Sequence, residues 1–188
     1  MEQYPHIRIL MGIVLGLSIT TLLKGLAQYV QHPGRQKPYW IHIGWAVTMF
    51  VLLVHFWWWE YRLTHVQEWT FLRYGFLIGY IVLFFLLCTL LFPDDLRDYD
   101  GYRDYFMSRR RWFFGLMALS YVVDLGDTLI KGRDYFAGLG HEYLFRNAAY
   151  VLLCLVAMRT RSQAFHAGFV AIALLYELSW IFRLYQHL

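Results

Sequence analysis

The amino-acid sequence predicts an all-α integral membrane protein, built as a bundle of six transmembrane helices. Hydrophobic residues make up 59% of the 188 residues and aromatic residues 20%, which is more apolar than an ordinary soluble domain. Several apolar runs reach about 20 residues, the length that an α-helix needs to cross the hydrocarbon core of a bilayer. We therefore expect residues 1–188 to form a single membrane domain.

The predicted helices follow the apolar runs in chain order. The first run is longer than the core of a signal peptide, and no small-x-small cleavage site follows it, so we expect a retained first helix. The connections are short except for the charged linker 93–111, so neighbouring helices should be antiparallel. The six predicted spans are Ile7–Val30, Tyr39–Tyr61, Thr70–Phe92, Trp112–Gly132, Tyr143–Met158 and Ala164–Tyr185.

Small residues recur at fourfold spacing in two of these spans. Gly12 and Gly16 lie in the first span, and Gly75 and Gly79 lie in the third. Small residues four positions apart let two helices approach closely inside a membrane. The spacing predicts helix-packing seams, and either glycine pair is a candidate contact for a homodimer.

Short matches between the two halves predict an inverted duplication, with repeat 1 at residues 7–92, the linker at 93–111 and repeat 2 at 112–185. The segment TLLKG at 21–25 is similar to TLIKG at 128–132, and two further matches keep the same order while the offset shrinks from 107 to 93. Three spans per repeat force the second repeat to insert upside down. Such repeats are typical of transporters and some channels.

The fourth predicted span carries charged residues on one face. Asp124, Asp127 and Lys131 share a stripe about 60° wide with Ser120, at about 100° per residue. A charge near the bilayer centre costs a few kcal/mol at least, so it normally faces the bundle interior or a wet cavity. We expect this stripe to face inward.

Two further polar residues lie deep in other predicted spans and complete a candidate pathway. His55 lies in the second span, and Glu177 lies in the sixth. Crowded carboxylates and an imidazole can bind or pass a proton or a small cation. We predict a channel or small transporter in which Asp124 and Asp127 bind the ion, Glu177 and His55 relay or gate it, and Lys131 neutralises the acids.

A purely structural role is the alternative for the same residues. A buried pair between Asp127 and Lys131, or between Asp124 and Lys24, would lock helices together. Buried ion pairs are poor sources of stability, however, so several buried acids are less easily explained in this way than one.

Haem or another flat apolar ligand is a second alternative. The sequence has eight His residues, but His42 and His55 are 13 residues apart and point about 140° away from each other on a helix. Two stacked haems are therefore unfavourable, and one b-type haem held between His55 and His166 is the version that the spacing permits. The sequence requires no cofactor.

Catalysis is a third alternative, centred on the linker 93–111. Asp94, Asp95 and Asp98 spell DDxxD, and Mg²⁺ held by Asp94 and Asp98 one helical turn apart would suit a lipid-phosphate enzyme. No second aspartate-rich motif, HExxH or phosphate-binding glycine loop accompanies it, so a charged surface helix and a protein that is not an enzyme are favoured. A membrane adaptor remains a further alternative, but an adaptor would not need Asp124 or Glu177.

The basic residues indicate membrane association and no binding of nucleic acid. The net charge is +4, and Lys and Arg lie at helix ends, where they meet anionic headgroups. They number 7 on the side of the N-terminus and 10 on the other, which favours an N-terminus outside the cytoplasm. Stretches such as HFWWWEYRL are typical of bacterial inner-membrane proteins. We expect that location, with the lipid bilayer and a small cation or proton as partners.

Overall fold

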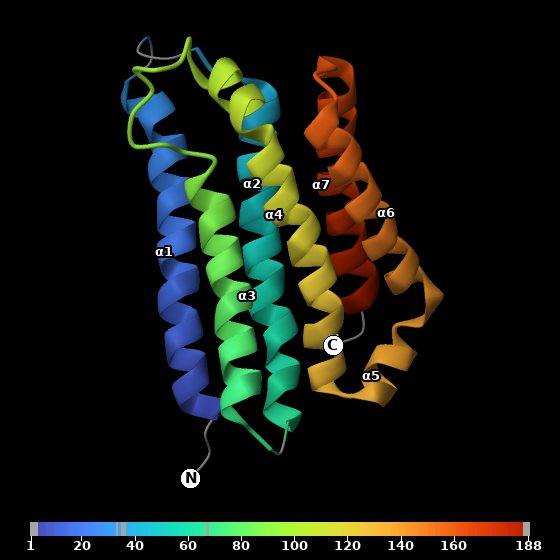
Figure 1. The fold of residues 1–188 in the computed structure, drawn as a ribbon. Helices are drawn as coiled ribbons and strands as arrows, with labels where there is room; N and C mark the ends of the chain where they lie inside the picture. Colours follow the sequence, from blue (N-terminus) through green and yellow to red (C-terminus); the bar gives the residue numbers. More distant parts are fainter. Residues whose placement is uncertain (1–3, 33, 35–36, 67, 186–188) are drawn as a thin grey trace.

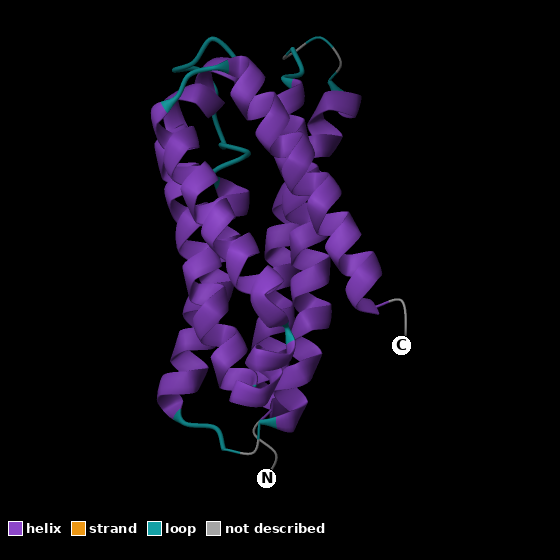
Figure 2. Cartoon of the chain, turned by 90° about the vertical axis from the view of Figure 1, so that its right-hand side faces the viewer, coloured by secondary structure: helices purple, strands orange, loops and turns teal. Residues whose placement is uncertain are grey.

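The computed structural model describes residues 4–32, 34, 37–66 and 68–185, and every regular element in these ranges is helical. The long helices run side by side, with their connections gathered at the two ends (Figures 1 and 2). The elements are α1 (Tyr4–Gln31), α2 (Trp40–Trp59), the 3₁₀ helix η1 (Glu60–His65), α3 (Phe71–Thr89), α4 (Tyr102–Lys131), α5 (Arg133–Gly138), α6 (Gly140–Arg159) and α7 (Gln163–Tyr185).

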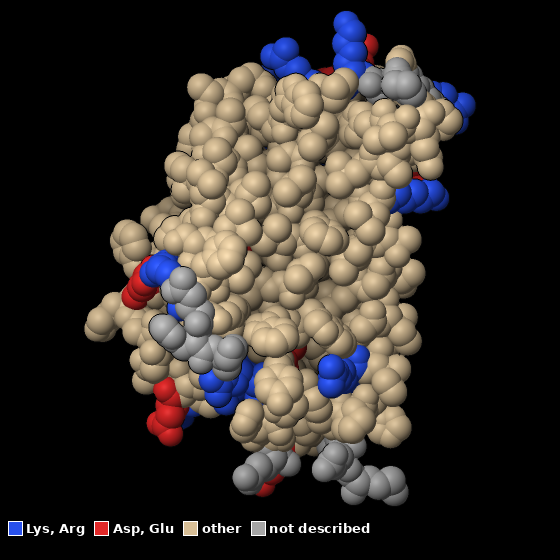
Figure 3. All heavy atoms as spheres, turned by 180° about the vertical axis from the view of Figure 1, so that it is seen from behind, with Lys and Arg blue, Asp and Glu red and all other residues tan. Residues whose placement is uncertain are grey.

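Five helices are long and apolar enough to cross a membrane, as expected for an integral membrane protein: α1, α2 with η1, α3, α4 and α7. On the face in Figure 3 most charged side chains lie toward the two ends of the molecule, and the middle is largely uncharged apart from one group at the left edge. The helix α6 has 20 residues, but it carries Glu142 and Arg146 in its first turns and Arg159 at its end. The sixth crossing therefore stays a prediction.

The linker is shorter than the sequence predicted. The helix α4 begins at Tyr102 instead of Trp112, so the second half of 93–111 is the first part of a 30-residue helix. Gly101 precedes it with φ 98°, a conformation that glycine adopts without strain, and Asp104 in the first turn suits the positive end of the helix dipole. The charged surface helix and the apolar span are thus continuous.

Aromatic rings fill the half of the bundle that is farther from the N-terminus. Trp45 of α2 meets Phe113 and Phe114 of α4 and Phe169 of α7 edge to face, with ring centroids 5.5, 5.4 and 5.1 Å away. Such pairs add about 0.5–1.5 kcal/mol each beyond their burial. This apolar half contrasts with the polar half near the N-terminal end, where the candidate site lies.

A buried arginine joins α4 to the end of α6 in this apolar half. Arg110 of α4 donates from Nε to the carbonyl of Thr160 at 3.1 Å and from Nη1 to that of Met107 at 2.5 Å. Thr160 is the residue that ends α6. A guanidinium at this position donates to a carbonyl at the end of the helix, and its positive charge is stabilised by the negative end of the helix dipole.

The glycine spacing did not identify contacts between helices of the same chain. Nothing lies within 4 Å of a Cβ built on Gly16, Gly75 or Gly79, and all three are exposed. Gly25 makes a close contact instead, because a Cβ there would lie 2.2 Å from the ring of Phe92. The predicted seam is wrong for the three exposed glycines, while a homodimer through Gly12/Gly16 or Gly75/Gly79 stays a prediction.

The helix packing gives no support to the inverted duplication. In the first half, α1 packs mainly along α3, whereas in the second half α4 packs mainly along α6. The halves are joined by α2 against α7 and α3 against α4. Units related by an inverted repeat would pair equivalent helices, so the duplication stays a prediction from sequence alone.

Candidate functional site

A small cavity lies between α2, α3, α4, α6 and α7, inside the half of the bundle near the N-terminal end. Its volume is about 50 Å³, which holds one or two water molecules. Asp124 on its wall is seven residues from the end of α4, or roughly 10 Å along the helix. The lining residues are Leu52, His55, Phe56, Trp59, Tyr80, Phe84, Ser120, Tyr121, Asp124, Arg146 and Glu177.

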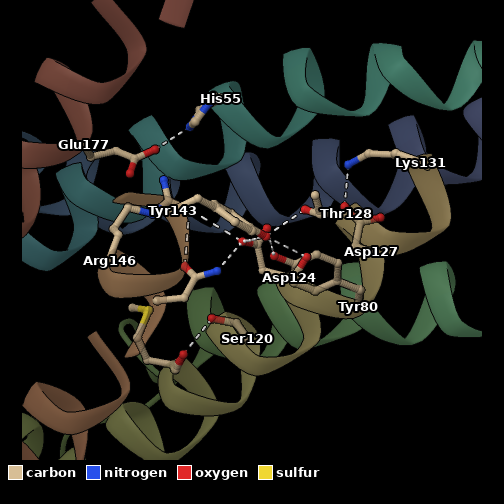
Figure 4. A network of polar contacts seen from close by, with 12 residues as sticks. His55, Tyr80, Ser120, Asp124, Asp127, Thr128, Lys131, Tyr143, Arg146 and Glu177 are labelled. Atoms are coloured by element: carbon tan, nitrogen blue, oxygen red, sulfur yellow. Dashed lines mark hydrogen bonds and ion pairs between the residues drawn. The ribbon is translucent and has the colours of Figure 1, made fainter. Parts of the chain in front are cut away.

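Asp124 is held by polar groups from two neighbouring helices (Figure 4). Its Oδ2 accepts hydrogen bonds from Tyr143 at 2.8 Å and Asn147 at 3.0 Å, and its Oδ1 accepts one from Tyr80 at 3.3 Å. The Arg146 guanidinium lies 3.5 Å from Oδ2. Asp124 is therefore a fixed carboxylate whose charge is balanced by a residue of α6.

His55 and Glu177 form a direct pair on the same cavity. His55 Nδ1 contacts Glu177 Oε1, and these side chains are 8% and 4% exposed. The other ring nitrogen of His55 lies 3.4 Å from the Tyr185 hydroxyl. An imidazole joined to a carboxylate on one side and a hydroxyl on the other can take up a proton at one nitrogen and release it at the other.

A second buried cluster lies nearer the end of α4. The Lys131 ammonium contacts Asp127 one turn earlier on α4 and Glu60 Oε1 of η1 at 2.7 Å. The side chains of Lys131, Glu60 and Asp127 are 0%, 2% and 1% exposed. The ammonium also lies 5.3 Å from the ring of Trp59. We call Glu60, Asp127 and Lys131 the triad.

The predicted pathway residues thus fall into two adjacent groups. Asp124, Glu177 and His55 line the cavity, and Asp127 and Lys131 belong to the triad outside the cavity wall. The predicted Asp127–Lys131 contact is confirmed. The alternative pairing of Asp124 with Lys24 is wrong, because Lys24 is exposed on α1 and Asp124 meets groups of α3 and α6.

Two charged members of these groups were not predicted from sequence. Glu60 follows three tryptophans, and that run looks like an interfacial belt, yet Trp59 is 5% exposed and Glu60 is buried beside it. Arg146 begins a predicted span, where a snorkelling arginine is ordinary, but its guanidinium turns inward and lies 4.7 Å from the ring of Trp180. Both residues lie near the end of a predicted span, where a charged side chain ordinarily reaches the membrane surface.

The haem alternative does not fit the positions of the two histidines. His55 contacts Glu177, and His166 lies 11 residues from Glu177 on the same helix, roughly 16 Å along its axis. His166 stacks on Phe114 in the aromatic half and contacts the Thr160 carbonyl at 3.2 Å. Both rings cannot reach one iron, so the prediction of a haem between them is wrong. The cavity is also far smaller than the roughly 300 Å³ that a flat apolar ligand needs.

The DDxxD stretch does not form a helical turn. Asp94 and Asp98 lie in the irregular connection between α3 and α4, so the expected spacing of one turn is wrong. Asp95 accepts from the backbone N–H of Arg97 at 2.8 Å and pairs with its guanidinium, and these contacts hold the pKa of Asp95 below its ordinary value. In the described part of the chain, no three His, Cys, Asp or Glu side chains cluster as metal ligands would.

A cavity of about 300 Å³ lies beside this connection, at the other end of the bundle from the triad. Gln28, Tyr29 and His32 of the α1 end line it together with Asp94 and Asp95. Asp95 is already paired with Arg97, so among the described lining residues Asp94, His32 and Gln28 are left to offer a carboxylate, an imidazole and an amide oxygen to a cation.

Comparisons with protein families, curated proteins and solved structures find no match for this chain.

Proposed function

We propose that this protein is a channel or small transporter that moves protons across the membrane through the cavity. The observation that carries the proposal is the buried His55–Glu177 pair on a water-sized cavity that Asp124 also lines. Ionisable groups inside a membrane protein are costly and usually mark an ion or proton path. Glu177 and His55 exchange the proton, and Asp124 holds the Arg146 guanidinium at the same cavity.

The cavity favours a proton over a metal cation. Arg146 lies 3.5 Å from Asp124 and supplies a permanent positive charge at the place where a cation would bind. Its own positive charge repels a second cation, whereas a proton needs only an acceptor atom and a water-sized space. A volume of about 50 Å³ leaves little room for an alkali ion with its hydration shell.

The same observations disfavour an adaptor whose bundle only docks a partner. Apolar side chains stabilise such a bundle at least as well as buried charges do. Here Asp124, Arg146, His55 and Glu177 converge from four helices on one cavity. A protein that needed only a surface would not require this arrangement.

The test is proton flux into liposomes that contain the purified protein and a pH-sensitive dye. A potassium gradient with valinomycin sets the membrane potential. We expect wild-type protein to acidify the lumen, and Glu177→Gln to lower the rate at least about tenfold, because the amide cannot accept the proton. Asp124→Asn should also lower the rate.

Matched controls test whether replacing any acid by its amide changes the proton flux. Glu68→Gln and Asp134→Asn make the same chemical changes at exposed positions outside the long helices, and both should leave the flux unchanged. Wild-type flux in both Glu177→Gln and Asp124→Asn would remove these acids from the mechanism. A wild-type protein that conducts no protons would refute the function.

A further inference from the structure

The triad has more acceptor atoms than donors can satisfy. Lys131 bonds one oxygen of Glu60 and one oxygen of Asp127. Among the described residues, the remaining oxygens, Glu60 Oε2 and Asp127 Oδ1, are buried without a hydrogen-bond partner. A buried acceptor without a donor costs about 1–3 kcal/mol, and more if it is charged.

The charges of the triad do not balance either. Two carboxylates and one ammonium leave one negative charge in a region where all three side chains are at most 2% exposed. Among the described residues no second cation forms an ion pair with the triad: Arg8 lines a cavity of about 90 Å³ with Glu60 but lies over the ring of Trp57, and Arg62 lies over the ring of Tyr135. An uncompensated charge in such a place is strongly unfavourable.

The other titratable groups around the triad do not supply the missing positive charge. Apart from Lys131, the titratable groups that interact electrostatically with Glu60 or Asp127 are phenols or a further acid. They are Tyr4 of α1, Tyr80 of α3, Asp124 of α4, Tyr135 of α5 and Tyr185 of α7.

We propose that Glu60 and Asp127 share one proton, so that the triad is a second protonation site of this protein. The proton forms an O–H bond on one carboxyl group and a hydrogen bond to the free oxygen of the other. It satisfies both unpaired oxygens and makes the triad neutral with Lys131. The geometry that brings the two carboxyl groups together is their contact with the same Lys131 ammonium.

The triad lies between the cavity and the end of the bundle, where it would bind the proton first in the proposed pathway. This role rests on the proposed function. Glu60 lies where α2 ends, and Lys131 is the last residue of α4, so both lie nearer the end of the bundle than the cavity does. Trp59 separates the two groups: it lines the cavity, meets the His55 ring edge to face at 5.7 Å and lies 5.3 Å from Lys131. A proton that enters from this end reaches the triad before it reaches His55.

Infrared spectroscopy tests the shared proton without measuring flux. A protonated carboxyl group has a carbonyl-stretching band that a carboxylate lacks, and this band shifts when the sample is moved from H₂O to D₂O. We expect purified wild-type protein at neutral pH to show the band. It should disappear in Glu60→Gln and in Asp127→Asn, because the new amide donates the hydrogen bond and the remaining acid pairs with Lys131 as a carboxylate.

The controls exclude a general effect of replacing an acid by an amide. Glu68→Gln should keep the band, and the far-ultraviolet circular dichroism and thermal midpoint of each variant should stay near those of wild type, since each amide keeps the shape and hydrogen bonding of the acid. A band that persists in both Glu60→Gln and Asp127→Asn would overturn the proposal. A band lost in both variants of a protein without proton flux would support the shared proton and refute only the transport function.

Discussion

Lys131→Met tests how far the buried charges depend on one another. Lys131 is the only cation that forms ion pairs with Glu60 and Asp127 among the described residues, and its side chain is fully buried. Met fills nearly the same volume but leaves two acids without a cation. Removing one partner of a buried pair costs about 3–5 kcal/mol, which is a change of roughly 10²–10⁴ in the unfolding equilibrium.

The assay is reversible unfolding in mixed micelles with increasing sodium dodecyl sulfate, followed by tryptophan fluorescence and circular dichroism. Neutralising the acids as well, in Lys131→Met with Glu60→Gln and Asp127→Asn, should recover part of the loss, because this variant leaves no buried charge without a partner. A single Lys131→Met variant within about 1 kcal/mol of wild type would refute the inference that the triad is an electrostatic unit.

Two further substitutions test how the helices are packed and joined. Gly25→Ala places a Cβ 2.2 Å from the Phe92 ring and should destabilise the fold by about 1–3 kcal/mol in the same assay. Gly16→Ala meets nothing within 4 Å and should be neutral or slightly stabilising. Equal effects of the two substitutions would contradict the packing of α1. Arg110→Met removes the bonds to the Thr160 and Met107 carbonyls and should cost about 2–3 kcal/mol, and an unchanged unfolding midpoint would show that water replaces the guanidinium at the end of α6.

Hydropathy predicted the helices well because an apolar segment that crosses a bilayer must satisfy its own backbone hydrogen bonds, and an α-helix does so. Each of the six predicted spans overlaps one long helix, from α1 to α7. The start of α4 was placed ten residues late, since hydropathy measures where the apolar segment begins and gives no information on where the helix begins. The glycine spacing was less informative, because it marks a narrow helix face without saying what covers that face.

The inward stripe on α4 was predictable because it lies on a single helix, whose periodicity fixes the relative directions of Asp124, Asp127 and Lys131. Their partners were less predictable, because they come from other helices. Glu60 and Arg146 lie near predicted span ends, where a charged residue usually reaches headgroup water. Packing against other helices turns both side chains inward. Sequence periodicity gives directions only within one helix, so it does not predict this packing.

The buried charges differ in how much a proton would disturb them. Asp124 has Arg146 and three hydrogen-bond donors, so protonating it would weaken the contacts that join α4 to α3 and α6. Glu177 has His55, and a proton that moves between them leaves the net charge of the pair unchanged. The triad has two acids and one permanent cation, so the one proton proposed for it is held without breaking an ion pair with Lys131. In the proposed conduit, a proton that entered from this end of the bundle would exchange with the proton held by the triad before it reached His55.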